Sequence, residues 1–199
     1  TMKDMAGDLL KVLSHLEIKK AFFVGHSFGV QILVEFYKEF TSYVEGMVFV
    51  NGFVKNPMPD MACGSIISMI YQGMKRAYKN LPETTTALWK QLATNILTMH
   101  LSGLIGGFNL RLTNVKDIEV YARGVSSVSL GVFLTLFDEI IKYDGTNFLK
   151  LIETPTLIIS GEMDSITPKK HQIELHEKIK GSQLLALPYG SHCCQLDMP

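Results

Sequence analysis

The pentapeptide Gly25-His26-Ser27-Phe28-Gly29 constrains the fold of this 199-residue chain more than any other segment. It reads G-x-S-x-G, with an apolar run at 21–24 before it and a helix-like apolar run at 30–37 after it. This order predicts a sharp turn from a strand into a helix, in which a strained serine holds its hydroxyl above the sheet. We expect glycine at both flanking positions because the backbone passes too close for a side chain.

A serine hydroxyl becomes a nucleophile only when a base takes its proton and an acid orients that base. Downstream, Asp164 follows the apolar run 157–159, and His192 follows the apolar run 184–187. Both residues lie just past the carboxyl end of a predicted parallel strand, where open α/β sheets place their chemistry. Ser27, Asp164 and His192 are therefore the candidate catalytic residues, in the chain order Ser, Asp, His.

Other residues compete for these roles. Asp164 could instead cap the helix that begins near Pro168, because aspartate favours helix starts. Glu162 offers a second acid in the same loop, and Asp138 a third within a helical pattern. His26 precedes the serine and is expected to pack or to line the pocket rather than to act as a base. The remaining histidines fall in helix-like segments, namely His15, His100, His171 and His176.

With these segments the chain resembles the α/β-hydrolase family. The matching stretches are G-H-S-F-G, P-T-L-I-I-S-G-E-M-D-S-I-T-P, and G-S-H followed by residues 193–199. The resemblance spans most of the chain outside about 57–140. It implies that Ser27 is the nucleophile, His192 the base and Asp164 the acid that orients the base.

The expected fold is α/β, with a doubly wound, mostly parallel sheet. Residues 1–56 and 141–199 would form the core, with strands at about 20–26, 46–51, 155–161 and 183–188 and a helix before the first strand. Far more residues separate the second and third strands than a parallel crossover needs. The excess, 57–140, is predicted to be an inserted helical element, with helices at 62–78, 84–99, 117–123 and 130–143.

In the family such an insertion forms a cap over the active site. Most of its apolar side chains would pack on the sheet, and a few would line an apolar pocket. The residues expected to bind substrate are His26, Phe28, Met69 and Met99, where methionine suits an adaptable surface.

The transition state of acyl transfer needs two hydrogen-bond donors for its oxyanion. One would be the backbone N–H of Phe28, at the start of a helix whose dipole also helps. In the family the second donor comes from a loop after an earlier strand, and nothing in this sequence corresponds to it. We therefore expect the sequence to be a fragment of a longer protein or, alternatively, the isolated chain to be a poor catalyst, and the second donor is unknown.

Charge and cysteine content exclude several classes of protein. Lys plus Arg equals Asp plus Glu at 19 each, and no basic stripe supports nucleic-acid binding. No apolar run is long enough for a transmembrane helix. The 3 cysteines suggest no disulfide framework, and no metal-ligand spacing appears. We expect a cytoplasmic protein without metal or cofactor, in which Cys193 packs beside the base rather than reacts.

The sequence thus predicts a serine hydrolase that cleaves an ester or similar small acyl substrate with an apolar portion, through an acyl-enzyme. Fold does not fix function, so the same three residues would also suit an acyltransferase, a lyase or a cofactor-free peroxidase. A ligand-binding or receptor-like protein with little turnover is a further alternative.

Overall fold

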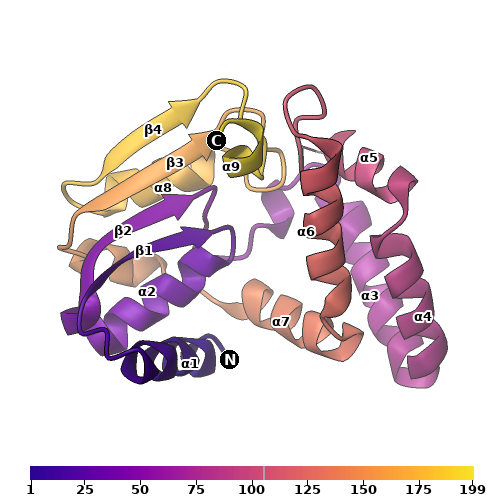
Figure 1. Ribbon diagram of the computed structural model, residues 1–199, viewed down its shortest axis with the longest axis horizontal. Coiled ribbons are helices and arrows are strands. Elements are labelled where there is room, and N and C mark those ends of the chain that lie inside the picture. The colour runs from indigo at the N-terminus through magenta and orange to yellow at the C-terminus, as the bar shows by residue number, and fades with distance from the viewer. Residues whose placement is uncertain (105) are drawn as a thin grey trace.

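The computed structural model describes residues 1–104 and 106–199, and all of their side chains except those of Ile96, Met99, Ser102 and Leu104. Within this part of the chain a four-stranded parallel sheet has the strand order β1-β2-β3-β4 (Figure 1). The strands are β1 (Ala21–His26), β2 (Val44–Val50), β3 (Thr156–Gly161) and β4 (Gln183–Leu187). The predicted α/β class, the parallel pairing and the approximate strand positions are confirmed.

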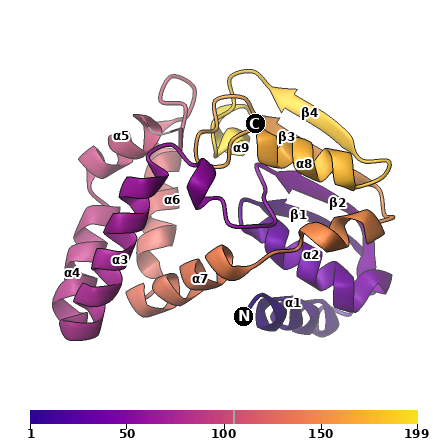
Figure 2. The ribbon, with the colours of Figure 1, turned by 180° about the vertical axis from the view of Figure 1, so that it is seen from behind.

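Two crossover helices cover one face of the sheet. Helix α2 (Gly29–Phe40) connects β1 to β2, and α8 (Lys170–Lys178) connects β3 to β4. Parallel crossovers are right-handed, so both helices reach the same face, as Figure 2 shows from behind. The strand side chains on that side are buried, including Phe23, Phe49 and Ile158. Helix α1 (Met2–His15), the predicted first helix, packs against α2.

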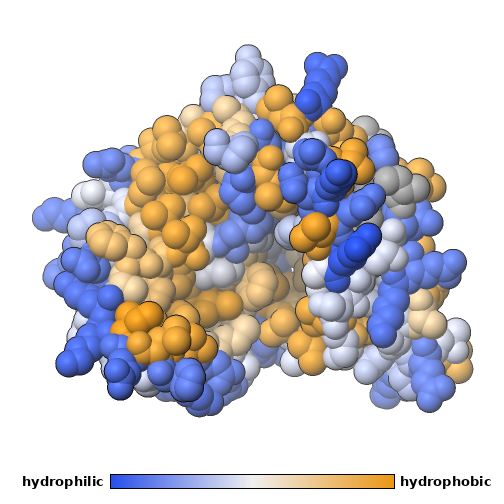
Figure 3. All heavy atoms as spheres, in the orientation of Figure 1, coloured by the Kyte–Doolittle hydropathy of each residue, from blue (hydrophilic) through white to orange (hydrophobic). Residues whose placement is uncertain are grey.

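The opposite face of the sheet is apolar and exposed. Phe22 and Val24 on β1 are 69% and 70% exposed, and Leu185 on β4 is 47% exposed. Figure 3 shows hydrophobic side chains gathered over the strands on this side. Parallel strands that are apolar on both faces are typical of sheets buried on both sides. Among the described residues α1, α2 and α8 all lie on the other side, so this face stays open.

Between β2 and β3 the chain forms a helical segment, and both ribbon views place α3–α6 to one side of the sheet (Figures 1 and 2). Its helices are α3 (Gly64–Asn80), α4 (Pro82–Ala93), α5 (Ile96–Leu104), α6 (Val115–Ser127) and α7 (Leu130–Lys142). The predicted single helix over 84–99 is wrong, because the chain breaks at Thr94 and Asn95. There the Asn95 side chain accepts the N–H of Leu97, which starts a new helix.

Short elements complete the described chain. They are the 3₁₀ turns η1 (Thr41–Tyr43), η2 (Met58–Asp60) and η3 (Thr146–Leu151), and the terminal helix α9 (Cys194–Asp197). In the described ranges no single helix is long and apolar enough to cross a bilayer. Helices α6 and α7 reach that length only as a pair, and they bend by 96° at their junction. The predicted boundary of the cap at 140/141 falls inside α7.

Candidate active site

The turn after β1 holds Ser27 in a left-handed backbone conformation, with φ of 56°. Its N–H donates to the carbonyl of Val50 at the end of β2 (2.9 Å), which fixes the turn on the sheet. Glycine is required at 25, where a Cβ would lie 2.8 Å from Leu33 and 3.0 Å from the Gly29 backbone. The same expectation is wrong for Gly29, because a Cβ at this helix start would meet no described atom within 4 Å.

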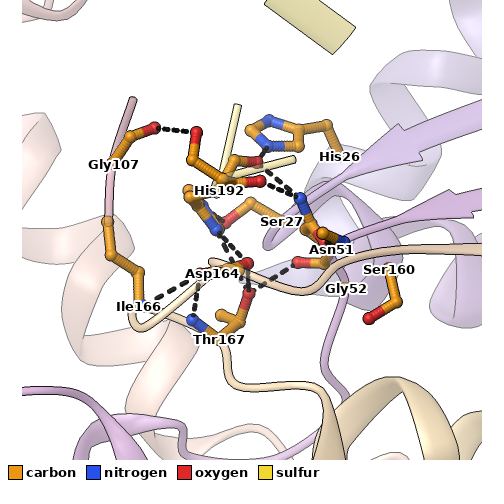
Figure 4. A network of polar contacts seen from close by, with 12 residues as sticks. His26, Ser27, Asn51, Gly52, Gly107, Ser160, Asp164, Ile166, Thr167 and His192 are labelled. Atoms are coloured by element: carbon orange, nitrogen blue, oxygen red, sulfur yellow. Dashed lines mark hydrogen bonds and ion pairs between the residues drawn. The ribbon is translucent and has the colours of Figure 1, made fainter. Parts of the chain in front are cut away.

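The structure brings the serine and the predicted base together. His192 Nε2 lies 2.9 Å from Ser27 Oγ, although the two residues are far apart in the chain (Figure 4). The other ring nitrogen, Nδ1, lies 2.9 Å from Asp164 Oδ2. Because a carboxylate only accepts, Nδ1 carries the proton and Nε2 is free to accept the serine hydroxyl proton. This is the tautomer that a general base needs.

The loop after β3 holds the carboxylate of Asp164 from several sides. Its Oδ1 accepts the N–H groups of Ile166 and Thr167, both at 2.8 Å. Its Oδ2 accepts the hydroxyl of Thr167 (2.6 Å) as well as the His192 ring. The side chain is buried, with 0% of it exposed. These bonds leave the carboxylate one orientation, aimed at the imidazole.

The two competing acids lie elsewhere. Glu162 accepts a hydrogen bond from Lys169 at the surface. Asp138 on α7 accepts bonds from Tyr71 (2.7 Å) and Lys75 (2.6 and 2.8 Å) on α3. Lys75 lowers the pKa of Asp138, and Tyr71 adds to this effect despite the opposing cost of burial. Asp138 therefore serves as an ion-pair partner between helices of the inserted segment.

The N–H of Phe28 makes no hydrogen bond to another described residue, and it lies directly before the first turn of α2. It is thus available to an oxyanion, as predicted, and its role stays a prediction.

His26 faces the base rather than a cavity. Its ring centroid lies 4.9 Å from that of His192, and its Nε2–H donates to the His192 carbonyl oxygen (2.8 Å). Burial, together with the smaller effect of the neighbouring His192 ring, lowers the pKa of His26 from its ordinary 6.5 to about 4. His26 is therefore a neutral donor at physiological pH that supports the loop carrying the base.

Asn51 is a structural residue of the site that the sequence analysis missed. It directly follows β2, is fully buried and has φ of 45°. Its Nδ2 donates to the carbonyl oxygens of Ser191 (2.7 Å) and His192 (2.8 Å), and its Oδ1 accepts the N–H of Gly161 (2.7 Å). Asn51 thus joins the ends of β2 and β3 to the histidine loop. A polar residue just past an apolar strand was the available signal, the same one that marked Asp164.

Asp197 is a second residue that supports the site. This carboxylate is buried, with 5% of the residue exposed. Its Oδ2 accepts the N–H and the hydroxyl of Ser191, both at 2.6 Å. Its Oδ1 accepts the N–H of Asn109 (3.0 Å) and the hydroxyl of Thr113. Asp197 therefore joins the histidine loop to the stretch between α5 and α6.

We expect Asp197→Asn to lower the free energy of unfolding by about 1–3 kcal/mol, because an amide nitrogen would replace an oxygen that accepts buried hydrogen bonds. Urea unfolding would measure the change, with exposed Asp117→Asn as the matched control. Equal stability of the two variants would contradict the joining role.

An apolar cavity of about 350 Å³ lies beside Ser27. Its walls come from the turn after β1, the stretch around η2, and helices α6 and α7, and include Phe28, Met58, Met61, Phe133 and Phe137. Phe28 thus lines this cavity, and its part in substrate binding stays a prediction. The structure does not support the expectation for Met69, because its side chain is 68% exposed and does not line this cavity. Met99 falls among the residues whose side chains lie outside the described part.

The two cysteines next to His192 are packed in the core. Cys193 and Cys194 are 2% and 1% exposed. Burial raises the pKa of Cys193 to about 12 and that of Cys194 to about 11. Both thiols stay protonated at neutral pH, which agrees with packing rather than reactivity. Among the described residues no cluster of three or more His, Cys, Asp or Glu could hold a metal ion.

Comparison with known proteins places this geometry in context. A family model described as alpha/beta hydrolase fold matches residues 1–199. The chain is similar to the uncharacterized hydrolase YugF of Bacillus subtilis, with 25% identity over 203 residues that cover 100% of this chain and 68% of the relative. It is also similar to the putative carbamate hydrolase RutD of Stutzerimonas stutzeri, with 22% identity over 96% of this chain and 66% of the relative.

Among solved structures, a thermophilic esterase from Thermogutta terrifontis superposes with a TM-score of 0.72 at 17% identity, covering 100% of this chain and 68% of that one. The chain therefore spans about two thirds of the length of these relatives.

Proposed function

Because the chain belongs to the alpha/beta hydrolase family, we propose that it is a serine hydrolase acting on an ester or a similar acyl substrate with an apolar portion. One observation carries the proposal, the continuous contact from Ser27 Oγ to the His192 ring and on to Asp164, with 2.9 Å at each step. The apolar cavity beside Ser27 supports the apolar part of the substrate.

In the first half of the proposed reaction, Ser27 Oγ attacks the carbonyl carbon of the substrate. His192 Nε2 takes the hydroxyl proton, and the Asp164 carboxylate stabilises the imidazolium that forms. The negative oxygen of the tetrahedral intermediate accepts the Phe28 N–H. His192 then gives its proton to the leaving alkoxide oxygen, the carbon–oxygen bond breaks, and Ser27 is left as an acyl ester.

In the second half, a water molecule loses a proton to His192 Nε2 and attacks the acyl carbon. The intermediate collapses with the proton returning to Ser27 Oγ, which releases the carboxylic acid and restores the enzyme. The burial of Asp164 and the bonds from Asn51 to the histidine loop serve this cycle, because they keep the base in one position through both halves.

Product analysis in oxygen-labelled water with a competing short alcohol tests this proposal. We expect labelled free acid as the main product from simple neutral esters, because the proposed acyl-enzyme is released to water. A carbamate belongs among the test substrates, given the name of one relative. A transfer ester as the main product would instead favour an acyltransferase. Tight binding of esters without turnover would favour a ligand-binding protein.

A further inference from the structure

A second apolar cavity, of about 410 Å³, adjoins His192. It shares three lining residues with the first cavity, namely Tyr121 and Val125 of α6 and Ile166 of the acid loop. These three side chains form the boundary between the two spaces.

Each of the two cavities adjoins a different one of the proposed nucleophile and the proposed base. Ser27 lines the first cavity and His192 the second. In the proposed reaction the acyl carbon bonds to Ser27 Oγ, whereas the leaving oxygen receives its proton from His192 Nε2. The leaving alcohol must therefore lie on the His192 side. Its substituent then points towards the second cavity, and the acyl chain towards the first.

The walls of the second cavity fit an uncharged group. They come mainly from helices α3, α4 and α6, with Met74, Trp89, Leu92, Ile118 and Ala122 among them. No Lys, Arg, Asp or Glu lines it in the described part of the chain. Burial raises the pKa of both Tyr121 and Cys193 to about 12, so these two wall residues are neutral at physiological pH.

The volume of the second cavity gives a lower limit for the size of the group that fills it. Apolar cavities of about 150 Å³ accept a benzene ring, and this space is well over twice as large. A methyl or ethyl group would leave most of it empty and forfeit the contacts that its walls can make.

We propose that the second cavity binds the bulky, uncharged alcohol half of an ester, while the first cavity binds the acyl half. This inference rests on the proposed function, since it takes the direction of the leaving group from Ser27 and His192. It selects esters of branched, cyclic or aromatic alcohols as the substrate class.

Two ester pairs test the proposal in the wild-type protein. We expect cyclohexylmethyl butyrate to exceed methyl butyrate in kcat/KM by at least about tenfold, the effect of a well-filled apolar pocket. We expect 3,3-dimethylbutyl butyrate to exceed choline butyrate, its cationic isostere, although choline is the better leaving group. A preference for methyl or choline esters would overturn the proposal.

Variants assign the preference to the second cavity. Ala122→Phe fills it from α6, and we expect the cyclohexylmethyl-to-methyl ratio to fall by at least about tenfold. The ratio of octanoate to acetate methyl esters should stay as in the wild type. Val128→Phe, which narrows only the first cavity, is the matched control and should change the acyl ratio instead. If Ala122→Phe does not fold, Leu92→Trp, at a half-exposed wall position, decides in its place.

The proposal would be overturned if neither Ala122→Phe nor Leu92→Trp changed the cyclohexylmethyl-to-methyl ratio. In that case, fluorophosphonate labelling of Ser27 would show that the proposed function stands. Absence of both labelling and ester turnover in the wild type would instead defeat the proposed function, and this inference with it.

Discussion

Replacing Ser27 with alanine is expected to lower ester turnover by roughly 10⁶-fold and to abolish labelling by a fluorophosphonate probe. The variant lacks the oxygen that would bond to the acyl carbon, and no other described hydroxyl lies at His192 Nε2. Turnover kinetics and mass spectrometry of the labelled peptide would measure both effects.

Ser191→Ala is the matched control for the labelling, because Ser191 adjoins the base but bonds to Asp197 and the Gly107 carbonyl. This variant should still be labelled at Ser27. Labelling that survives in Ser27→Ala would show that another residue is the nucleophile.

Replacing Asp164 with asparagine is expected to lower turnover by roughly 10⁴-fold. The amide keeps the shape of the side chain, but it can turn an N–H towards His192 Nδ1. The imidazole would then carry its proton on Nε2, where it cannot accept one from Ser27. Turnover should fall, while the fold and the fraction of molecules in which Ser27 can be acylated stay unchanged. Circular dichroism would check the fold, and active-site titration would check that fraction.

Glu162→Gln is the matched control for the acid, because Glu162 lies two residues away and faces Lys169 at the surface. It should keep turnover close to that of the wild type. A large loss in Glu162→Gln with normal turnover in Asp164→Asn would identify Glu162 as the acid.

Local pattern was enough to predict the sheet and the three candidate catalytic residues. Ser27, Asp164 and His192 each lie within five residues of the carboxyl end of an apolar strand, and the carboxyl ends of parallel strands meet at one edge. The choice of Asp164 over Glu162 was less determined by sequence, because it depends on how the loop turns. In the structure the N–H groups of Ile166 and Thr167 settle the position of its carboxylate.

The contacts that support the site could not be predicted in the same way. Asn51 bonds to residues 140 and 141 positions away, and Asp197 to Asn109 and Thr113 across 88 and 84 positions. Nothing in the local pattern around these residues names such partners. The prediction that Met69 binds substrate failed for a related reason. The sequence of an amphipathic helix such as α3 does not show which of its apolar residues lie at the edge of the buried stripe.

The hydrogen bonds of Asp197 limit which segments can be exchanged between related enzymes to make chimaeras. One such exchange would graft the inserted helical segment of a relative in place of the segment found here. Here the insert supplies Asn109 and Thr113 to a buried carboxylate whose other oxygen holds the loop of the base. A graft that took the helices without these two donors would leave one oxygen of the Asp197 carboxylate without its partners, beside the loop that carries the proposed base His192. The insert and the C-terminal loop therefore form one transferable unit, and chimaeras should be cut outside both.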